Sequence, residues 1–437
     1  MGVPAQLQRM LASYFTDRRL VYDTDNGPVT RPLTAGVPQG SILGPTLWNV
    51  MYDSVLSVEL PVGARSIAYA DDLVLLIPAK TSAGAAQRAS RAIAAVNRWM
   101  VKHHLSIAPA KTEIILVSRK RKTINVPVFV NGQTIKTQQS MRYLGVQLDH
   151  HLSWLPHVRR VAEKATNVAN AVIRLMRNHS GPKGAKRRLI SSVVESVLRY
   201  AAPIWHEAVN TREGRRLLWR AQKSCAIKTA FAFRTVGYKS AVAIANIVPI
   251  CRLVSEDARC YQRLRSSDGS LSRQTVRQEE RMVTLRHWQD ERGKDAAKTG
   301  ASRYDRWTLR VLPDIAAWHF RKHGEVNFYL CQVLSGHGFF RDHLHCMSYA
   351  LSPDCSWCPG VPETADHAIF ECPHFDEIRR RFINVEGQEA ISPDNLQRCV
   401  RTAELNGRVF GTLLRRAKVF EDDKEPLHSE RFQWQIT

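Results

Sequence analysis

In the first third of the chain, apolar positions alternate with the period of β-strands in several short segments. One longer segment between them has the period of a helix. Short apolar, β-rich runs flank Asp71-Asp72 and predict a hairpin. Asn131-Gly132 predicts a second hairpin, because this dipeptide favours the tight turn that joins two strands. Between them, residues 84–105 carry an apolar stripe at helical spacing. We therefore expect an α+β domain over residues 1–150.

From Leu155 onward the period is helical. Apolar residues three and four apart predict an amphipathic helix that ends before Gly181-Pro182, and further helices follow over 183–202, 212–232 and 239–264. Residues 266–302 are polar and weakly periodic, which is typical of a linker. The predicted organisation is an α+β domain (1–150), a helical domain (151–265), a polar linker (266–302) and a small C-terminal domain (303–437).

The surplus of positive charge begins after residue 80. The 437-residue chain has a net charge of +23, and residues 1–80 hold six basic against seven acidic side chains, so the surplus lies in 81–437. A single basic run is commonly a solvated face, but a surplus of this size indicates a polyanionic partner. Lys186, Arg187 and Arg188 belong to a cluster at the 174–188 turn that has no acidic residue.

Nine cysteines suggest metal ligands rather than disulfide bonds. Cys355, Cys358, His367 and Cys372 have the residue types and close spacing of a tetrahedral zinc site, and His374 is an alternative to His367. A looser group is more typical of packed or surface histidines than of a second metal site; its members are His337, His343, His345 and Cys346.

The Asp71-Asp72 pair has a possible catalytic role. Nucleotide polymerisation is a phosphoryl transfer served by two divalent metals, which needs carboxylates on rigid backbone. Neighbouring strand residues point to opposite faces, so both aspartates can hold the same metals only if the turn twists. Asp71 is the better ligand candidate. The alternative is that the pair only caps a hairpin.

Residues 36–45, Gly-Val-Pro-Gln-Gly-Ser-Ile-Leu-Gly-Pro, form a fixed loop about thirty residues before the aspartate pair. This loop resembles motif B of reverse transcriptases, and Tyr69-Ala70-Asp71-Asp72 resembles motif C. In the same order, residues 105–112 resemble motif D, although the usual Asn is replaced, and Tyr143-Leu144-Gly145 resembles motif E, the primer grip. Trp48-Asn49 and the motif E residues favour the non-LTR, LINE-like branch.

The rest of the chain adds to this resemblance. Residues 221–253 are similar to the helical thumb of these enzymes, and residues 307–375 are similar to the C-terminal region of the jockey-like and ribosomal-DNA-inserting elements. The resemblance implies a partial palm, a thumb and a zinc knuckle that act in RNA-directed DNA polymerisation during target-primed insertion. Implied partners are an RNA template, a DNA primer or target, and deoxynucleoside triphosphates.

The resemblance also implies roles for individual residues. Asp71 and Asp72 would hold Mg²⁺, Lys111 would assist the leaving group, and the knuckle would hold Zn²⁺. Template and substrate contacts would come from Pro38, Gln39, Gly40, Tyr69, Lys186, Arg187 and Arg188.

One departure affects activity. The motif A aspartate should precede motif B, but Asp17, Asp23 and Asp25 do not lie on an apolar strand pattern. We therefore expect motif A and the fingers to be missing and the chain to be inactive alone. A non-catalytic nucleic-acid-binding remnant of an element is the alternative. A nuclear or cytoplasmic ribonucleoprotein is expected rather than a secreted protein, and the basic run 119–122 is read as a phosphate-facing or solvated loop in preference to an import signal.

Overall fold

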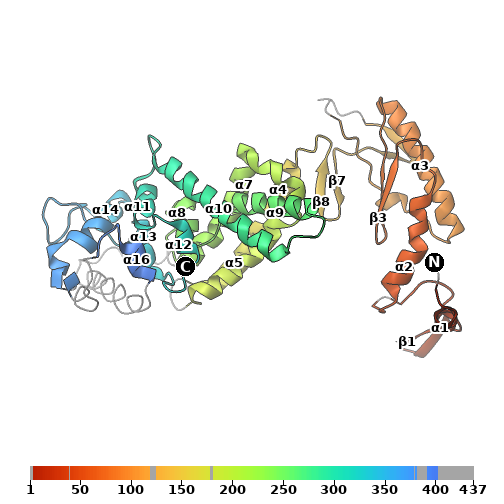
Figure 1. Cartoon of the computed structure of the whole chain (residues 1–437), viewed down its shortest axis with the longest axis horizontal. Helices are drawn as coiled ribbons and strands as arrows, with labels where there is room; N and C mark the ends of the chain where they lie inside the picture. Colours follow the sequence, from red (N-terminus) through yellow and green to blue (C-terminus); the bar gives the residue numbers. More distant parts are fainter. Residues whose placement is uncertain are drawn as a thin grey trace. The chain divides into compact units, whose positions relative to one another are not determined.

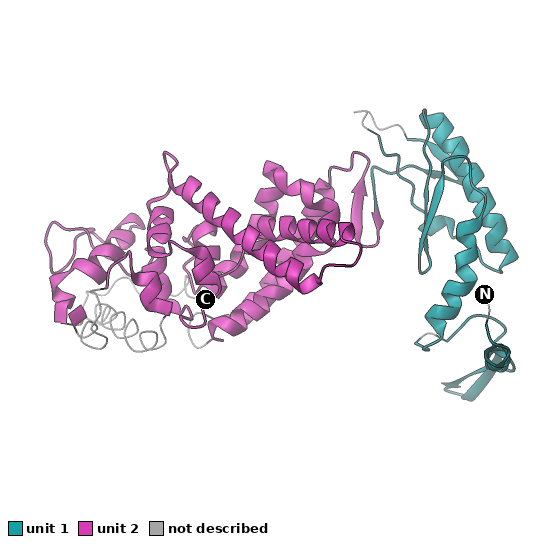
Figure 2. Cartoon of the chain, in the orientation of Figure 1, with its two compact units in different colours: residues 1–141 teal, residues 142–437 magenta. Residues whose placement is uncertain are grey.

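The computed structural model describes residues 3–38, 40–118, 125–177, 181–377, 379–380 and 391–401. The chain divides into two compact units, residues 1–141 and 142–437 (Figure 2). Helices and strands both occur, as the sequence predicts, and the described strands pair only into two-stranded sheets (Figure 1).

The first unit combines helices with antiparallel hairpins. Its core contains Tyr52, Val55, Val96 and Met100, which come from the end of α2, the turn after it and one face of α3. The elements are α1 (Ala5–Phe15), β1 (Arg19–Thr24), β2 (Gly27–Pro32), α2 (Gly44–Tyr52), η1 (Asp53–Ser57), β3 (Arg65–Tyr69), β4 (Asp72–Leu76), α3 (Ser82–Lys102), η2 (Pro109–Lys111), β5 (Pro127–Val130) and β6 (Gln133–Lys136).

Both predicted hairpins of this unit are present. β3 pairs with β4 around the aspartates, and β5 pairs with β6 around Asn131-Gly132. Asn131 and Gly132 have φ of 44° and 81°, the left-handed values that this turn needs. The residues that resemble motif E lie at the turn between β7 (Ser140–Tyr143) and β8 (Val146–Asp149).

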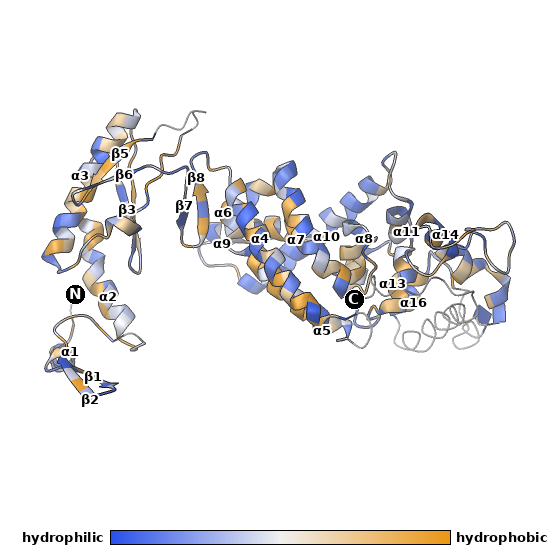
Figure 3. Ribbon diagram, turned by 180° about the vertical axis from the view of Figure 1, so that it is seen from behind, coloured by the Kyte–Doolittle hydropathy of each residue, from blue (hydrophilic) through white to orange (hydrophobic). Residues whose placement is uncertain are grey.

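The second unit is helical, and its amphipathic helices carry apolar residues on one side (Figure 3). Two cores share helices α7 and α9, so the predicted thumb and C-terminal domain form one unit. The elements are α4 (Leu155–Val172), η3 (Ile173–Leu175), α5 (Gly184–Arg199), α6 (Ala202–Trp205), η4 (His206–Asn210), α7 (Arg212–Thr229), α8 (Tyr238–Ala245), α9 (Ile250–Ser266), α10 (Arg273–Ala296), α11 (Arg303–Val311), α12 (Ile315–His319), α13 (Phe328–Ser335), α14 (Arg341–Cys346), η5 (His367–Glu371), η6 (Pro373–Phe375) and α16 (Leu396–Arg401).

Two predicted boundaries differ from the structure. The helix predicted over 239–264 is broken at Asn246, which adopts φ of 56° and ends α8, and α9 begins after Pro249. The linker predicted over 266–302 is largely the helix α10, which packs along α9. Within the described part of the chain, no helix combines the length and the apolar character needed to cross a membrane.

Candidate functional site

The aspartate pair lies at a strained hairpin turn. Tyr69 pairs with Asp72, so Ala70 and Asp71 make the turn itself. Ala70 has φ of 52°, a left-handed conformation that costs a residue with a side chain about 1 kcal/mol or more. The indole of Trp48, on α2, donates a hydrogen bond of 3.0 Å from Nε1 to the Ala70 carbonyl oxygen. Helix α2 therefore holds the strained turn that presents Asp71.

The aromatic face of α2 lies close to the negative charges of this turn. The Trp48 and Tyr52 rings stack with centroids 5.1 Å apart. Burial raises the pKa of the Tyr52 phenol, and the nearby charges of Asp71 and Asp72 raise it further, so this phenol stays neutral. Both aspartates are exposed and can receive a divalent cation. Among the described residues, no cluster of three or more His, Cys, Asp or Glu ligands includes Asp71.

The glycine-rich loop leads into α2. The Ser41 N–H donates to the Pro38 carbonyl at 3.2 Å, and the Gly44 N–H lies 3.0 Å from Ser41 Oγ. A Cβ at residue 44 would lie 2.9 Å from that oxygen, so a larger residue would displace the Ser41 side chain from this hydrogen bond. Gly40 has φ of 87°, and Gln39 lies outside the described residues.

The other predicted polymerase residues are accessible. Tyr69 is 65% exposed on β3. Lys111 is exposed at the end of η2, and within the described residues it makes no ion pair with Asp71 or Asp72. Asp17 precedes β1, and Asp23 lies on the exposed strand β1. The basic run 119–122 lies outside the described residues.

The turn predicted as a primer grip is anchored to the helical unit. Leu144 and Gly145 have φ of 44° and 81°. The Tyr200 hydroxyl donates to the Leu144 carbonyl at 2.8 Å, and a Cβ at residue 145 would meet the Tyr200 ring at 3.0 Å. The backbone N–H of Gln147 lies 3.2 Å from the His157 ring nitrogen Nδ1. The contacts with Tyr200 and with His157 of α4 thus hold the turn and the start of β8.

One predicted phosphate contact is wrong. The Arg187 side chain is fully buried, and its guanidinium donates to the carbonyl oxygens of Pro182, at 2.7 Å, and Lys228, at 2.5 Å. It also lies 3.6 Å from the centroid of the Phe231 ring, and burial lowers its pKa to about 10. Arg187 therefore closes the turn before α5 and cannot reach a phosphate. Lys186 is exposed. Arg188 is half-buried, and its guanidinium nitrogen lies 4.0 Å from a carboxylate oxygen of Glu325.

The structure reveals a basic surface that the sequence reasoning missed. Arg212, Arg216 and Arg220 are exposed on α7, four residues apart, so they form one row along the helix. None of the three makes an ion pair within the described part of the chain. We call this row the α7 stripe. The four-residue spacing of arginines in a predicted helix was the signal available in the sequence.

The four predicted zinc ligands come together. The Cys372 sulfur lies 3.9 Å from both the Cys355 and the Cys358 sulfur, and all four ligand atoms fall within 4.8 Å of one another. Sulfurs at two corners of a tetrahedron with Zn–S bonds of about 2.3 Å would be about 3.8 Å apart. Burial raises the pKa of the Cys372 thiol to about 12.

The histidine of this cluster is oriented as a ligand. His367 Nε2 is buried and has no hydrogen-bond partner among the described residues, while Nδ1 lies 3.8 Å from a Glu371 carboxylate oxygen. A carboxylate behind a ligating imidazole is a common metal-site arrangement. The alternative ligand, His374, instead stacks on Trp357 with centroids 3.9 Å apart. The residues present therefore fit a zinc ion.

The looser histidine group has a different structure. His337 and His343 are buried around Tyr304, whose hydroxyl lies 3.1 Å from His343 Nδ1. Burial lowers the pKa of His343 to about 4, and Cys346 contacts Arg303. These residues do not form a ligand cluster within the described chain.

Comparisons with known proteins identify a reverse transcriptase match in the first part of the chain and relatives among retrotransposon proteins. Residues 1–148 match the family model described as reverse transcriptase (RNA-dependent DNA polymerase). The chain is 25% identical over 391 residues to a putative 115 kDa protein in type-1 retrotransposable element R1DM of Drosophila melanogaster, covering 84% of this chain and 36% of that protein.

Two further relatives extend the comparison. A Pol polyprotein from an R1 element of Nasonia vitripennis is 25% identical, covering 79% of this chain and 86% of that protein. The RNA-directed DNA polymerase from the mobile element jockey of D. melanogaster is 26% identical, covering 46% of this chain and 23% of the polymerase. The chain spans 36% and 37% of the length of two R1 relatives. No solved structure matches the chain.

Proposed function

Since residues 1–148 carry a reverse transcriptase domain and the relatives of the chain are R1- and jockey-type non-LTR retrotransposon proteins, we propose that the chain contributes the palm, thumb and zinc knuckle of an RNA-directed DNA polymerase. The observation that carries this proposal is the β3–β4 turn. It presents Asp71 and Asp72 on rigid backbone, and the Trp48 hydrogen bond holds it in a strained conformation.

Asp71, with Asp72, would hold Mg²⁺ at the primer end, because two-metal phosphoryl transfer needs carboxylate ligands. Pro38, Gln39, Gly40 and Tyr69 would face the template and the incoming nucleotide. Lys111 would protonate the leaving group, and the turn at Leu144 would support the primer.

The helical unit would bind the nucleic-acid duplex and the element's RNA. Its charge favours this role, and the α7 stripe and Lys186 replace Arg187 as the proposed phosphate contacts. Each cation placed on a phosphate releases counterions, so affinity should fall steeply with salt. Cys355, Cys358, His367 (through Nε2) and Cys372 would hold zinc, which would stabilise the fold of the knuckle.

The test is primer extension on an RNA template with Mg²⁺. The chain spans about a third of the length of its longer R1 relatives. The assay therefore uses a chimaera, in which the segment of the jockey polymerase that matches this chain is replaced by the corresponding segment of this chain. We expect the chimaera to extend the primer and Asp71→Asn to reduce extension by about a thousand-fold or more, since the metal loses a ligand.

Glu59, an exposed acid in the segment before β3, provides the control. Glu59→Gln should leave primer extension unchanged. A chimaera that binds primer–template but gives no synthesis would favour the non-catalytic nucleic-acid-binding alternative. Equal extension by the Asp71→Asn variant would overturn the assignment of the metal ligand.

A further inference from the structure

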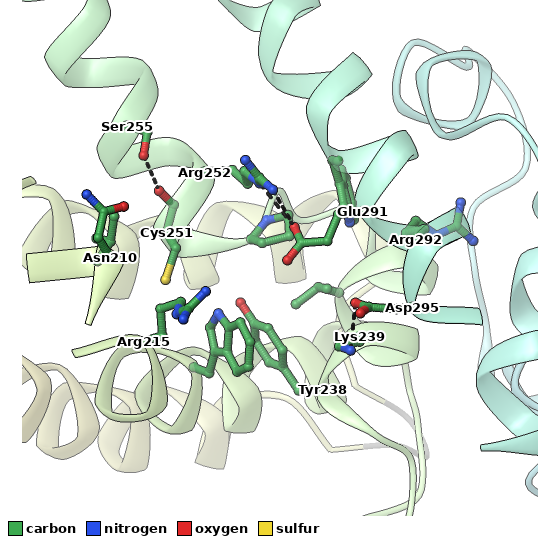
Figure 4. Close-up of a pocket in the computed structure, with 15 residues that line it drawn as sticks. Asn210, Arg215, Tyr238, Lys239, Cys251, Arg252, Ser255, Glu291, Arg292 and Asp295 are labelled. Carbon is green, nitrogen blue, oxygen red and sulfur yellow. Dashed lines mark hydrogen bonds and ion pairs between the residues drawn. The ribbon is translucent and has the colours of Figure 1, made fainter. Parts of the chain in front are cut away.

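A small cavity lies between α7, α8, α9 and α10 in the second unit (Figure 4). Its volume is about 130 Å³. Pockets for drug-sized ligands are roughly 300 Å³ or larger. This cavity therefore suits one planar ring and is too small for a nucleoside triphosphate.

Aromatic rings form part of the cavity wall. Trp219 and Tyr238 both line it, and their rings stack with centroids 5.3 Å apart and planes 23° apart. The Tyr238 hydroxyl is already used, because it donates at 2.6 Å to the Gln222 side-chain oxygen. The pair consequently offers a ring surface rather than a polar group to a ligand.

Most charges around the cavity are already paired. Arg252 binds Glu291 at 2.9 Å, and Lys239 binds Asp295 at 2.7 Å. Arg292 donates to the Leu312 carbonyl at 2.9 Å. The remaining lining cation is Arg215, which is exposed and makes no ion pair within the described residues. In Figure 4, Arg215 lies on the same side of the cavity as Tyr238.

The α7 stripe runs beside the residues of α7 that line the cavity. Arg215 and Trp219 are four residues apart on α7, so they share one row, and Arg212, Arg216 and Arg220 form the adjacent row. A strand whose phosphates follow the stripe would pass Arg215. A ring surface beside a track of cations is the arrangement with which proteins hold single strands.

We propose that this cavity captures one unpaired nucleotide of a nucleic-acid strand, with the base against Trp219 and its phosphate on Arg215. The inference rests on the proposed nucleic-acid binding of the helical unit and adds a preference for single-stranded segments. RNA and DNA strands both carry the required base and phosphate, so the experiment includes both.

The test uses the full chain and short RNA and DNA single strands that carry 2-aminopurine, compared with blunt duplexes. Fluorescence anisotropy reports binding, and 2-aminopurine emission reports stacking of the base. We expect binding of single strands to quench the emission, and Arg215→Ala to weaken single-strand binding by about ten-fold, with a smaller effect on duplexes. Trp219→Leu should abolish quenching.

Arg216→Ala is the matched control, because this neighbour belongs to the stripe but does not line the cavity. It should weaken all strands to a similar extent and leave quenching at saturation unchanged. Two results would overturn the proposal. One is emission that stays unquenched when a strand is bound, and the other is single-strand binding that is unchanged in both Arg215→Ala and a folded Trp219→Leu variant. If no strand bound at all, this proposal and nucleic-acid binding by the helical unit would both fail, while the primer-extension test of the aspartate turn would stand.

Discussion

Cys358 lies at the partly exposed edge of the cysteine–histidine cluster, whereas Cys355 and Cys372 are buried. We expect one zinc ion per chain, and Cys358→Ser should release it, because the remaining three ligands bind more weakly. Small sites of this kind owe much of their folding energy to the metal. Residues 350–375 should therefore exchange amide hydrogens faster in the variant, while the β3–β4 hairpin stays unchanged.

Metal analysis of freshly reduced protein and hydrogen exchange provide the two measurements. Cys346→Ser is the control, since Cys346 is exposed and outside the cluster. Less than about half an equivalent of zinc in the unmodified protein would contradict the assignment.

Helix α10 shows how ion pairs can replace an apolar stripe. Glu280 is only 6% exposed and accepts hydrogen bonds from Arg259 and Arg263 of α9, at 2.6 and 3.0 Å. Glu279, its neighbour, is exposed and pairs with Arg263 at 2.6 Å. Hydrogen bonds to a charged group contribute about 1.5–3 kcal/mol each, whereas an exposed ion pair contributes about 1 kcal/mol or less.

We therefore expect Glu280→Ala to lower the free energy of unfolding by about 3 kcal/mol, because it removes two hydrogen bonds between charged groups. Glu279→Ala, the matched control, should lower it by less than about 1 kcal/mol. Urea unfolding followed by circular dichroism measures both. Equal effects of the two substitutions would show that the buried ion pairs do not hold α10 on α9.

The same ion pairs explain what the sequence could and could not predict. The hairpin turns and the cysteine–histidine cluster depend on residues close in sequence, so spacing was sufficient to predict that their members come together. The inner face of α10 includes Glu280 and Thr284 beside Val276, Leu285 and Trp288, which hides its helical period and made it resemble a linker.

Contacts between distant residues were not predictable from periodicity. The carbonyl groups that accept hydrogen bonds from Arg187 belong to the loop before α5 and to the end of α7, and Trp48 on α2 contacts Ala70 in the β3–β4 turn. A basic run gives no indication of which of its members is buried, so Arg187 was assigned to the surface with its neighbours.

Acid sensitivity is a property of the whole helical unit. Burial lowers the pKa of His157, His319 and His343 to about 4 each, from an ordinary value near 6.5. Between these values the unfolded chain binds protons that the folded chain does not. Stability should therefore be constant above about pH 6.5 and fall as the pH drops toward 4, by on the order of 1 kcal/mol per pH unit for each histidine.

Urea midpoints at about pH 7 and about pH 5, with zinc in excess, measure this dependence. His157→Gln should reduce the loss, because glutamine retains a hydrogen-bond acceptor but does not titrate. His287→Gln, at an exposed position on α10, is the control and should leave the loss unchanged. An unaltered acid response in His157→Gln would show that His157 is not one of the groups responsible.

The contact between Tyr200 and the turn at residues 144–145 also restricts how the sequence can diverge. A side chain at residue 145 would face both the left-handed backbone and the Tyr200 ring, so a change there requires relief at position 200 as well. Loss of the ring alone would free the Leu144 carbonyl and leave the glycine under weaker constraint. Among related sequences, these two positions should therefore be inherited as a pair: tyrosine at 200 should accompany glycine at 145, and lineages that replace the glycine should already have lost the tyrosine.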